Sequence, residues 1–174
     1  QGNAFAQSNL GFMYRNGKGV NQDDTEACRY YKLAADQGNI IAINDLGNIY
    51  YENKSLEDYK KAFKYYKLGA DKKDPIAQSN LGCLFEEGQG VDKDFKKAFK
   101  YYKLSADQKE NYGFFNLAEC YRKGIGISKN KKTALKYYKL VAENTTDTSI
   151  AKDAQEEIDK LNLLSASWIP STCC

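Results

Sequence analysis

Residues 60–72 read KKAFKYYKLGADK, and residues 96–108 read KKAFKYYKLSADQ. Two related blocks, EACRYYKLAADQ and KTALKYYKLVAEN, begin at Glu26 and Lys132. A second motif, Ala-x-x-x-Leu-Gly, precedes each block and begins at Ala6, Ala42, Ala77 and, in a variant form, Gly113. These starting points are 36, 35 and 36 residues apart. Four copies at a nearly constant period predict a repeat protein.

Each repeat is predicted to form two helices. In the first motif, apolar residues recur at helical spacing, as in Ala77, Leu81, Leu84 and Phe85. In the second motif, the tyrosines fall on one half of the helix and the lysines on the other, so the tyrosines should pack and the lysines should face water. Glycine-containing turns such as EGQGV join the two helices. A short polar residue at one equivalent position is predicted to cap each second helix: Asp23, Asp58, Asp94 and Asn130.

The predicted fold is therefore all-α, an α-solenoid of stacked helix-turn-helix repeats with a capping helix at the C-terminal end. The four repeats are predicted at residues 1–37, 38–73, 74–109 and 110–144. The capping helix is predicted at 145–164, with its apolar positions at Ile150, Ala154, Ile158 and Leu161, and an irregular tail follows at 165–174. The opening QGN also occurs at residues 37–39, where two repeats join, so we expect the native protein to continue upstream.

Composition removes several kinds of chemistry. The 174 residues include no histidine, which is the commonest general base and a frequent metal ligand. None of the five cysteines forms a CxxC pair, so no metal site is predicted. Cys28 and Cys120 occupy packing positions, whereas Cys83 occupies a variable position that is a candidate for the surface. A net charge of +3 argues against a nucleic-acid-binding domain. We therefore expect no catalytic residue, no metal and no cofactor.

The motif resembles the Sel-one-like repeat family, a relative of the tetratricopeptide repeats. The similar residues are Ala-x-x-x-Leu-Gly-x-x-Tyr, Gly-x-Gly-Val and Ala-x-x-Tyr-Tyr-x-x-Ala-Ala-Asp-x-Gly-Asn, and they cover roughly residues 1–144. The second repeat departs from the pattern with ENKSLED in place of the double-glycine turn, and the fourth has Ala118 in the glycine position. The resemblance implies a non-enzymatic adaptor or scaffold. Its disulfide-rich bacterial branch has paired cysteines that this chain lacks, so the hydrolysis linked to that branch does not transfer.

The concave face of such a solenoid, lined by the first helices, is the predicted partner-binding surface. An asparagine before the motif leucine often contacts the ligand in related tetratricopeptide domains, although it could equally join local bonds between repeats. Neighbouring positions vary from repeat to repeat, as binding positions or neutral surface would. The candidate residues are Asn9, Phe12, Arg15, Asp45, Asn48, Tyr51, Asn80, Glu86, Asn116 and Arg122.

The second helices raise further alternatives. Leu33, Leu68, Leu104 and Leu140 lie on the lysine half of these helices. They form either an exposed interface or contacts covered by the next repeat, and we favour burial because solenoid helices have neighbours on two sides. The lysine rows could bind acidic groups but are favoured as a solvated surface. In the tail, Trp168 and Ile169 are possible interface residues, docking onto the cap or another chain.

The sequence thus predicts a scaffold that binds other proteins, with a peptide or helix in its groove. The alternative is a structural spacer subunit within a large assembly. We expect a cytoplasmic protein, because the odd number of irregularly spaced cysteines is not typical of a disulfide framework. A membrane would be a partner if the Cys173–Cys174 end were lipidated, although the C-a-a-X pattern is not met.

Overall fold

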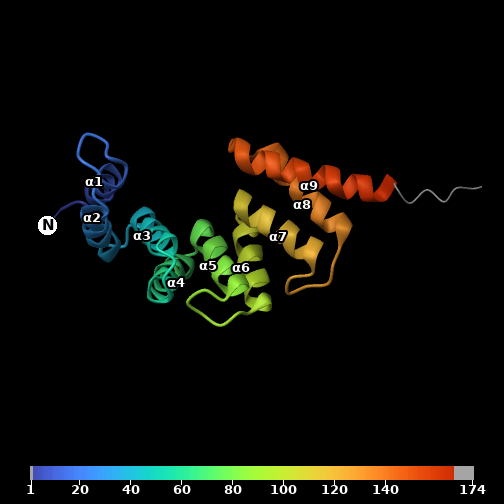
Figure 1. Ribbon diagram of the computed structural model, residues 1–174, viewed down its shortest axis with the longest axis horizontal. Helices are drawn as coiled ribbons and strands as arrows, with labels where there is room; N and C mark the ends of the chain where they lie inside the picture. Colours follow the sequence, from blue (N-terminus) through green and yellow to red (C-terminus); the bar gives the residue numbers. More distant parts are fainter. Residues whose placement is uncertain (1, 167–174) are drawn as a thin grey trace, which may run out of the picture.

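The computed structural model describes residues 2–166, and within this range the regular structure is helical. Four helix pairs follow one another along the long axis of the molecule, and a ninth helix lies across the C-terminal pair (Figure 1). The first helices of the pairs are α1 (Ala4–Asn16), α3 (Ile40–Glu52), α5 (Pro75–Glu87) and α7 (Asn111–Lys123). The second helices are α2 (Asp24–Asp36), α4 (Leu56–Asp71), α6 (Phe95–Asp107) and α8 (Lys131–Asn144), and the ninth is α9 (Thr148–Ala166). The all-α solenoid is confirmed.

Capping side chains begin the second helices, with one correction to the prediction. Asp23, Asp94 and Asn130 accept hydrogen bonds from backbone N–H groups of α2, α6 and α8, as predicted. The prediction for Asp58 is wrong, because this residue lies inside α4 and Ser55 is the cap. The Asp58 backbone N donates to Ser55 Oγ at 3.0 Å, and Ser55 Oγ donates to the Asp58 carboxylate at 2.7 Å. Ser55 in the ENKSLED segment therefore caps α4, which starts earlier than the equivalent helices.

The turns inside the repeats need backbone conformations that favour glycine. Gly88 ends α5 at φ +73°, and Gly90 follows at φ +68°. A β-carbon at Gly90 would lie 2.4 Å from the backbone carbonyl of Tyr59 in the preceding repeat, so the turn rests directly on its neighbour. In the second repeat, Lys54 occupies the left-handed region at φ +58°. This residue carries the strain that glycine avoids elsewhere.

Small residues allow the repeats to stack closely. Gly69 in α4 faces α5, where an added β-carbon would lie 2.5 Å from the Ala77 side chain. Each repeat also holds at least one stacked aromatic pair between its two helices, with ring centroids 5.5–6.1 Å apart. These pairs are Tyr14–Tyr30, Tyr50–Tyr65, Phe85–Tyr101 and Tyr121–Tyr137, and Phe114 also stacks on Tyr137. The first tyrosine of each Tyr-Tyr motif therefore packs inside its own repeat.

Helix α9 covers the apolar end of the stack. It packs mainly against α8, and Ile150, Ala154, Ile158 and Leu161 are buried as the periodicity predicts. It begins after the predicted start, at Thr148, and the helix extends past the predicted end at 164. A cap of this kind satisfies a helix pair that has no following repeat.

Candidate functional site

The first helices form the concave face of the stack. Besides their neighbours in sequence, α1 contacts α3 and α5 contacts α7, and no comparable contact joins successive second helices in the described part of the chain. The inner side of a curved stack is the more crowded side, so these contacts place the first helices there. Side chains also connect them: Arg15 pairs with Glu52 at 2.5 Å, and the Tyr51 hydroxyl donates to Glu87 at 3.1 Å.

The second tyrosine of each Tyr-Tyr motif reaches from the second helix toward this face. In the second repeat, Tyr66 is buried and its ring lies on Gly47, where an added β-carbon would be 2.4 Å from the ring. Its hydroxyl emerges beside the next residue and donates to Asn48 Oδ1 at 2.8 Å. The glycine of the Leu-Gly motif is therefore required by a tyrosine ring.

The same tyrosine meets a different group in the later repeats. Tyr102 lies on Gly82 and donates to the Glu86 carboxylate at 2.8 Å. Tyr138 donates to the Glu119 carboxylate. The ring packs on the motif glycine in the first three repeats, whereas the fourth repeat has Ala118 at that position. The group that the hydroxyl holds on the concave side also changes between repeats.

A pocket of about 220 Å³ opens between α3 and α5, at the centre of the concave face. It is lined by Asn48, Tyr51, Tyr66, Asn80 and Cys83. Asn80 Nδ2 donates to Asn48 Oδ1 at 3.5 Å, so this oxygen already accepts from two groups. No hydrogen bond within residues 2–166 engages Asn48 Nδ2 or Asn80 Oδ1. The pocket therefore offers one amide donor and one amide acceptor to a ligand.

Electrostatics around the pocket favour neutral or basic ligands. No lysine or arginine lines it, whereas Glu87 lies beside it and accepts the Tyr51 hydroxyl. Burial, and then the nearby Glu87 carboxylate, raise the pKa of Tyr51. Burial likewise raises the pKa of the Cys83 thiol to about 11, so the thiol is protonated and a weak nucleophile at neutral pH.

A denser charged cluster closes the C-terminal end of the concave face. Glu119 on α7 pairs with Arg122 at 2.7 Å and with Lys123 at 2.5 Å, and Arg122 reaches Glu157 on α9 at 3.3 Å. Burial acts to raise the pKa of Glu119, but hydrogen bonds from Arg122, Lys123 and Tyr138 outweigh it and hold that pKa at about 2. This cluster joins the last repeat to the cap.

Family models match this architecture at residues 4–39, 40–74, 75–110 and 115–145, each as a Sel1 repeat. The chain belongs to the Sel1 repeat family. Among curated proteins, none matches the chain.

Solved structures with the same repeats superimpose closely. A Sel1 repeat protein from Oxalobacter formigenes is 30% identical with a TM-score of 0.84, and the match covers 98% of this chain and 66% of that one. The c5321 protein of uropathogenic Escherichia coli, a protective antigen with an SLR fold, is 28% identical with a TM-score of 0.80, covering 96% of this chain and 38% of that one. Cysteine-rich protein B of Helicobacter pylori, at 23% identity and TM-score 0.58 over 78% of this chain and 95% of its own, shares the fold. This Sel1 repeat chain thus spans less than two thirds of the first two structures.

The ten candidate residues do not form one continuous site. Asn48, Tyr51 and Asn80 come together in the central pocket. Glu86 accepts the Tyr102 hydroxyl, Arg122 belongs to the charged cluster, and Arg15 pairs with Glu52. Asn116 donates to Ser79 Oγ at 3.1 Å, so it joins two repeats, through a side chain and not through the backbone bonds of the local alternative. Asn9 and Phe12 are exposed on α1, and Asp45 is half-buried on α3.

Four positions on the Sel1 repeats need correction. Leu33, Leu68 and Leu104 are 40%, 38% and 39% exposed, so the favoured prediction that neighbouring turns bury them is wrong, and Leu140 is half-buried. These leucines lie near the C-terminal ends of the second helices. Cys83, a candidate for the surface, is instead half-buried in the pocket wall. Cys28 and Cys120 pack as predicted.

Sequence reasoning missed the role of the tyrosine hydroxyls. The Leu-Gly motif was the available signal, because a glycine in a helix interior indicates a close approach by another group. Trp168 and Ile169 lie outside the described residues. Within those residues, no three side chains from His, Cys, Asp and Glu gather as metal ligands, and no helix is long and apolar enough to cross a bilayer.

Proposed function

We propose that this Sel1 repeat chain is a non-enzymatic scaffold or adaptor that binds an extended segment of a partner protein on its concave face. The observation that carries the proposal is the central pocket, where Asn48 and Asn80 present a free amide donor and a free amide acceptor side by side. A peptide backbone offers the complementary pair of groups in every residue. The Tyr66 hydroxyl holds the Asn48 side chain in place through a hydrogen bond, so this amide is oriented before a ligand binds.

The charges around the pocket indicate which peptides fit. Glu87 receives a hydroxyl hydrogen bond but forms no ion pair in the described part of the chain. A lysine or arginine of the ligand would supply that missing cation. A ligand bound by its terminal carboxylate is disfavoured, because the pocket is lined without a basic residue. We therefore propose an internal segment with a basic side chain near its centre.

Selection from a displayed library of random linear peptides tests this proposal. Peptides enriched on the wild-type protein should carry a basic residue at a fixed position, and the variant N48A/N80A should lose their binding. The variant N21A/N162A is the control, since both of these asparagines are exposed and distant from the pocket. E87K should weaken binding through charge repulsion. Enriched peptides that bind N48A/N80A as well as wild type would overturn the proposal.

The alternative is a structural spacer subunit of a large assembly. A row of exposed apolar side chains at the starts of the first helices favours it, because such surfaces mark protein contacts. The row consists of Phe5, Ile41, Ile76 and Tyr112. A spacer would lose its native complex, measured by native gel or sedimentation, in I41Q/I76Q and keep it in N48A/N80A. The compartment we propose is the cytoplasm, which suits the free thiols of Cys28, Cys83 and Cys120.

A further inference from the structure

The outer face of the solenoid carries a repeated surface that we call the lysine–leucine strip. Each second helix contributes two basic residues and one leucine at equivalent positions. The strip consists of Arg29, Lys32, Leu33, Lys64, Lys67, Leu68, Lys100, Lys103, Leu104, Lys136, Lys139 and Leu140. All eight basic residues are exposed, and the leucines are half-buried or slightly more exposed than that. The strip lies on the side of α4 opposite Tyr66, so it is separate from the concave pocket.

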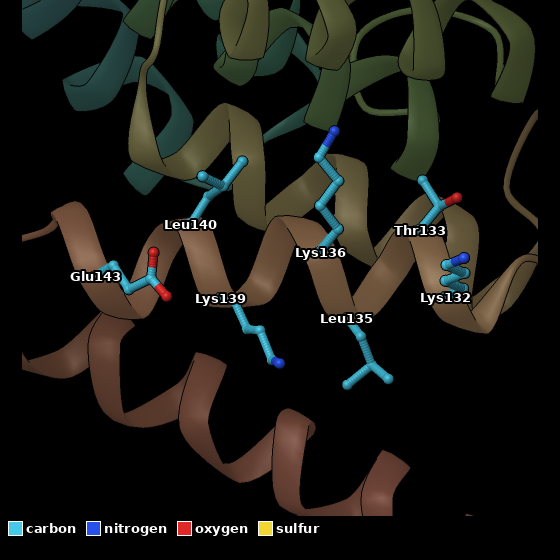
Figure 2. Close-up of a pocket in the computed structure, with 7 residues that line it drawn as sticks. All are labelled: Lys132, Thr133, Leu135, Lys136, Lys139, Leu140 and Glu143. Carbon is cyan, nitrogen blue, oxygen red and sulfur yellow. The ribbon is translucent and has the colours of Figure 1, made fainter.

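Two of the leucines, Leu68 and Leu140, lie in hollows beside the lysines. On α8, a hollow of about 590 Å³ is lined by residues that include Leu135, Lys136, Lys139 and Leu140. Figure 2 shows Lys136 and Leu140 at one edge of this helix and Leu135 and Lys139 at the other. A second hollow, of about 380 Å³, lies on α4. Its lining is Phe63, Lys64, Lys67, Leu68 and Asp71, which are the equivalent positions two repeats earlier. The same hollow therefore recurs on the outer face.

The strip has an excess of positive charge. In the second, third and fourth repeats, the two basic residues of the strip are accompanied by one carboxylate, at Asp71, Asp107 and Glu143. In the first repeat, Arg29 pairs with Glu26 at 2.8 Å and Asp36 is a second carboxylate, so the excess charge lies in the later repeats. Lys67 pairs with Asp71 at 2.9 Å and Lys103 with Asp107 at 2.7 Å, but all four side chains are about half exposed. Exposed pairs of this kind contribute little to stability and are easily exchanged. Lys64 and Lys100 form no ion pair within residues 2–166. The surface therefore has unsatisfied cations next to apolar hollows.

We propose that the lysine–leucine strip docks an acidic amphipathic helix of a partner protein. Apolar side chains of that helix fill the hollows over the leucines, and flanking Asp or Glu side chains pair with the lysines. A helix suits the strip because its side chains project into hollows. A flat lipid surface would touch the lysines first and leave the leucines uncovered. Nucleic acid would satisfy the lysines alone. A second copy of this chain would bring another basic strip and be repelled.

A synthetic helical peptide tests the proposal directly. The probe is a fluorescently labelled peptide of roughly 20 residues, about 30 Å long, with Leu on one face and Glu and Ala elsewhere. Fluorescence anisotropy should show saturable binding to the wild-type protein. L68Q/L104Q removes apolar contact and K64E/K100E reverses charge without breaking an ion pair, so each should weaken binding by roughly tenfold or more. K129E/K152E, which reverses two exposed lysines away from the strip, should bind like wild type.

The competing surfaces give different outcomes. A peptide with the same composition but scattered leucines should bind at least roughly tenfold more weakly. If both peptides bind equally and only K64E/K100E matters, the strip is an electrostatic surface and the proposal is overturned. Tighter binding to phosphatidylserine vesicles than to the peptide, unaffected by L68Q/L104Q, would overturn it in favour of a membrane. No saturable peptide binding up to about 1 mM would also overturn it.

This surface is independent of the concave pocket. The variant N48A/N80A should bind the acidic helical probe as wild type does. The peptides selected on the concave face should in turn bind L68Q/L104Q normally. Circular dichroism of each variant, with helical content equal to that of wild type, shows that the loss of binding is local.

Discussion

Tyr66 and Leu68 lie two residues apart on α4, yet they serve opposite faces of the molecule. Tyr66 passes under Gly47 and holds Asn48 on the concave side, whereas Leu68 lines a hollow on the outer side. The concave face differs in each repeat, and its polar groups are tied to buried tyrosines. The outer face repeats the same leucine and lysines, and these side chains make few contacts with the rest of the protein. Substitutions on the concave face should therefore change the stability of the fold, and substitutions on the outer face should change it little.

The largest expected loss of stability comes from disrupting the close contact between the motif glycine and the tyrosine ring. Gly82 lies under the Tyr102 ring, where an added β-carbon would be 2.6 Å from a ring carbon. Gly82→Val must push the ring or the helix aside, and we expect a loss of about 3 kcal/mol in unfolding free energy. Urea denaturation measures it. Glu87→Gln, which keeps an acceptor for the Tyr51 hydroxyl at an exposed position of the same helix, is the control. Equal stability of the two variants would contradict the coupling of concave face and core.

Low pH should lower the stability of the fold because it protonates Glu119 on the concave face. Its pKa is lowered from 4.5 to about 2 in the folded protein, so ionised Glu119 stabilises the fold above about pH 4.5, and this contribution is lost as pH falls toward 2. The loss amounts to up to about 3 kcal/mol. E119Q should therefore show a flatter fall of stability between these pH values than wild type. E156Q, an exposed position on α9, should behave like wild type. A wild-type profile for E119Q would contradict the prediction.

A smaller effect is expected when only the hydroxyl is removed. Tyr66→Phe keeps the ring on Gly47 but deletes the hydrogen bond to Asn48, which should lower the unfolding free energy by about 1 kcal/mol. The same variant should weaken peptide binding at the pocket, because Asn48 loses its support. Tyr51→Phe removes a hydroxyl from the same pocket without touching Asn48 and is the matched comparison. If Y66F kept full stability and full binding, the hydroxyl would have no positioning role.

The smallest effect is expected on the outer face. Because Leu68 and Leu104 are 38% and 39% exposed, the double variant L68Q/L104Q should lose only about 1 kcal/mol of unfolding free energy. Thermal or urea denaturation checks this, with Leu81→Ala as the contrasting variant of a fully buried leucine, for which we expect a loss of about 3 kcal/mol. Losses of similar size for both would mean that the strip is part of the core.

The sequence predicts the elements of this fold well because the repeat makes each signal appear four times. The apolar spacing of Ile150, Ala154, Ile158 and Leu161 also located the cap. The cap was wrongly predicted at Asp58 because aligning the repeats assumes that their turns have equal lengths. Without glycines, the second turn instead uses a left-handed Lys54, and the helix that follows is capped by Ser55.

The site was predictable only in part, for a geometric reason. Positions on one helix identify which residues share a face, so Asn48, Tyr51 and Asn80 could be named together. The Tyr66 hydroxyl belongs to another helix, and its reach through the gap over Gly47 depends on how closely two helices pack. The exposure of Leu68 depends in the same way on how much of its surface the neighbouring helices cover. The spacing of residues within one motif does not reveal how closely two helices pack or how much of a side chain a neighbouring helix covers.

The stacked aromatic pair in each repeat also has an optical consequence. Three of the pairs join two tyrosines with interplanar angles of 9°, 6° and 9°, close enough for their ultraviolet transitions to couple. The third repeat has Phe85 in place of one tyrosine, at Phe85–Tyr101, and so should contribute a weaker and differently shaped band. The near-ultraviolet circular dichroism of the folded protein should therefore contain a contribution from stacked tyrosines that is lost when the helix pairs unfold.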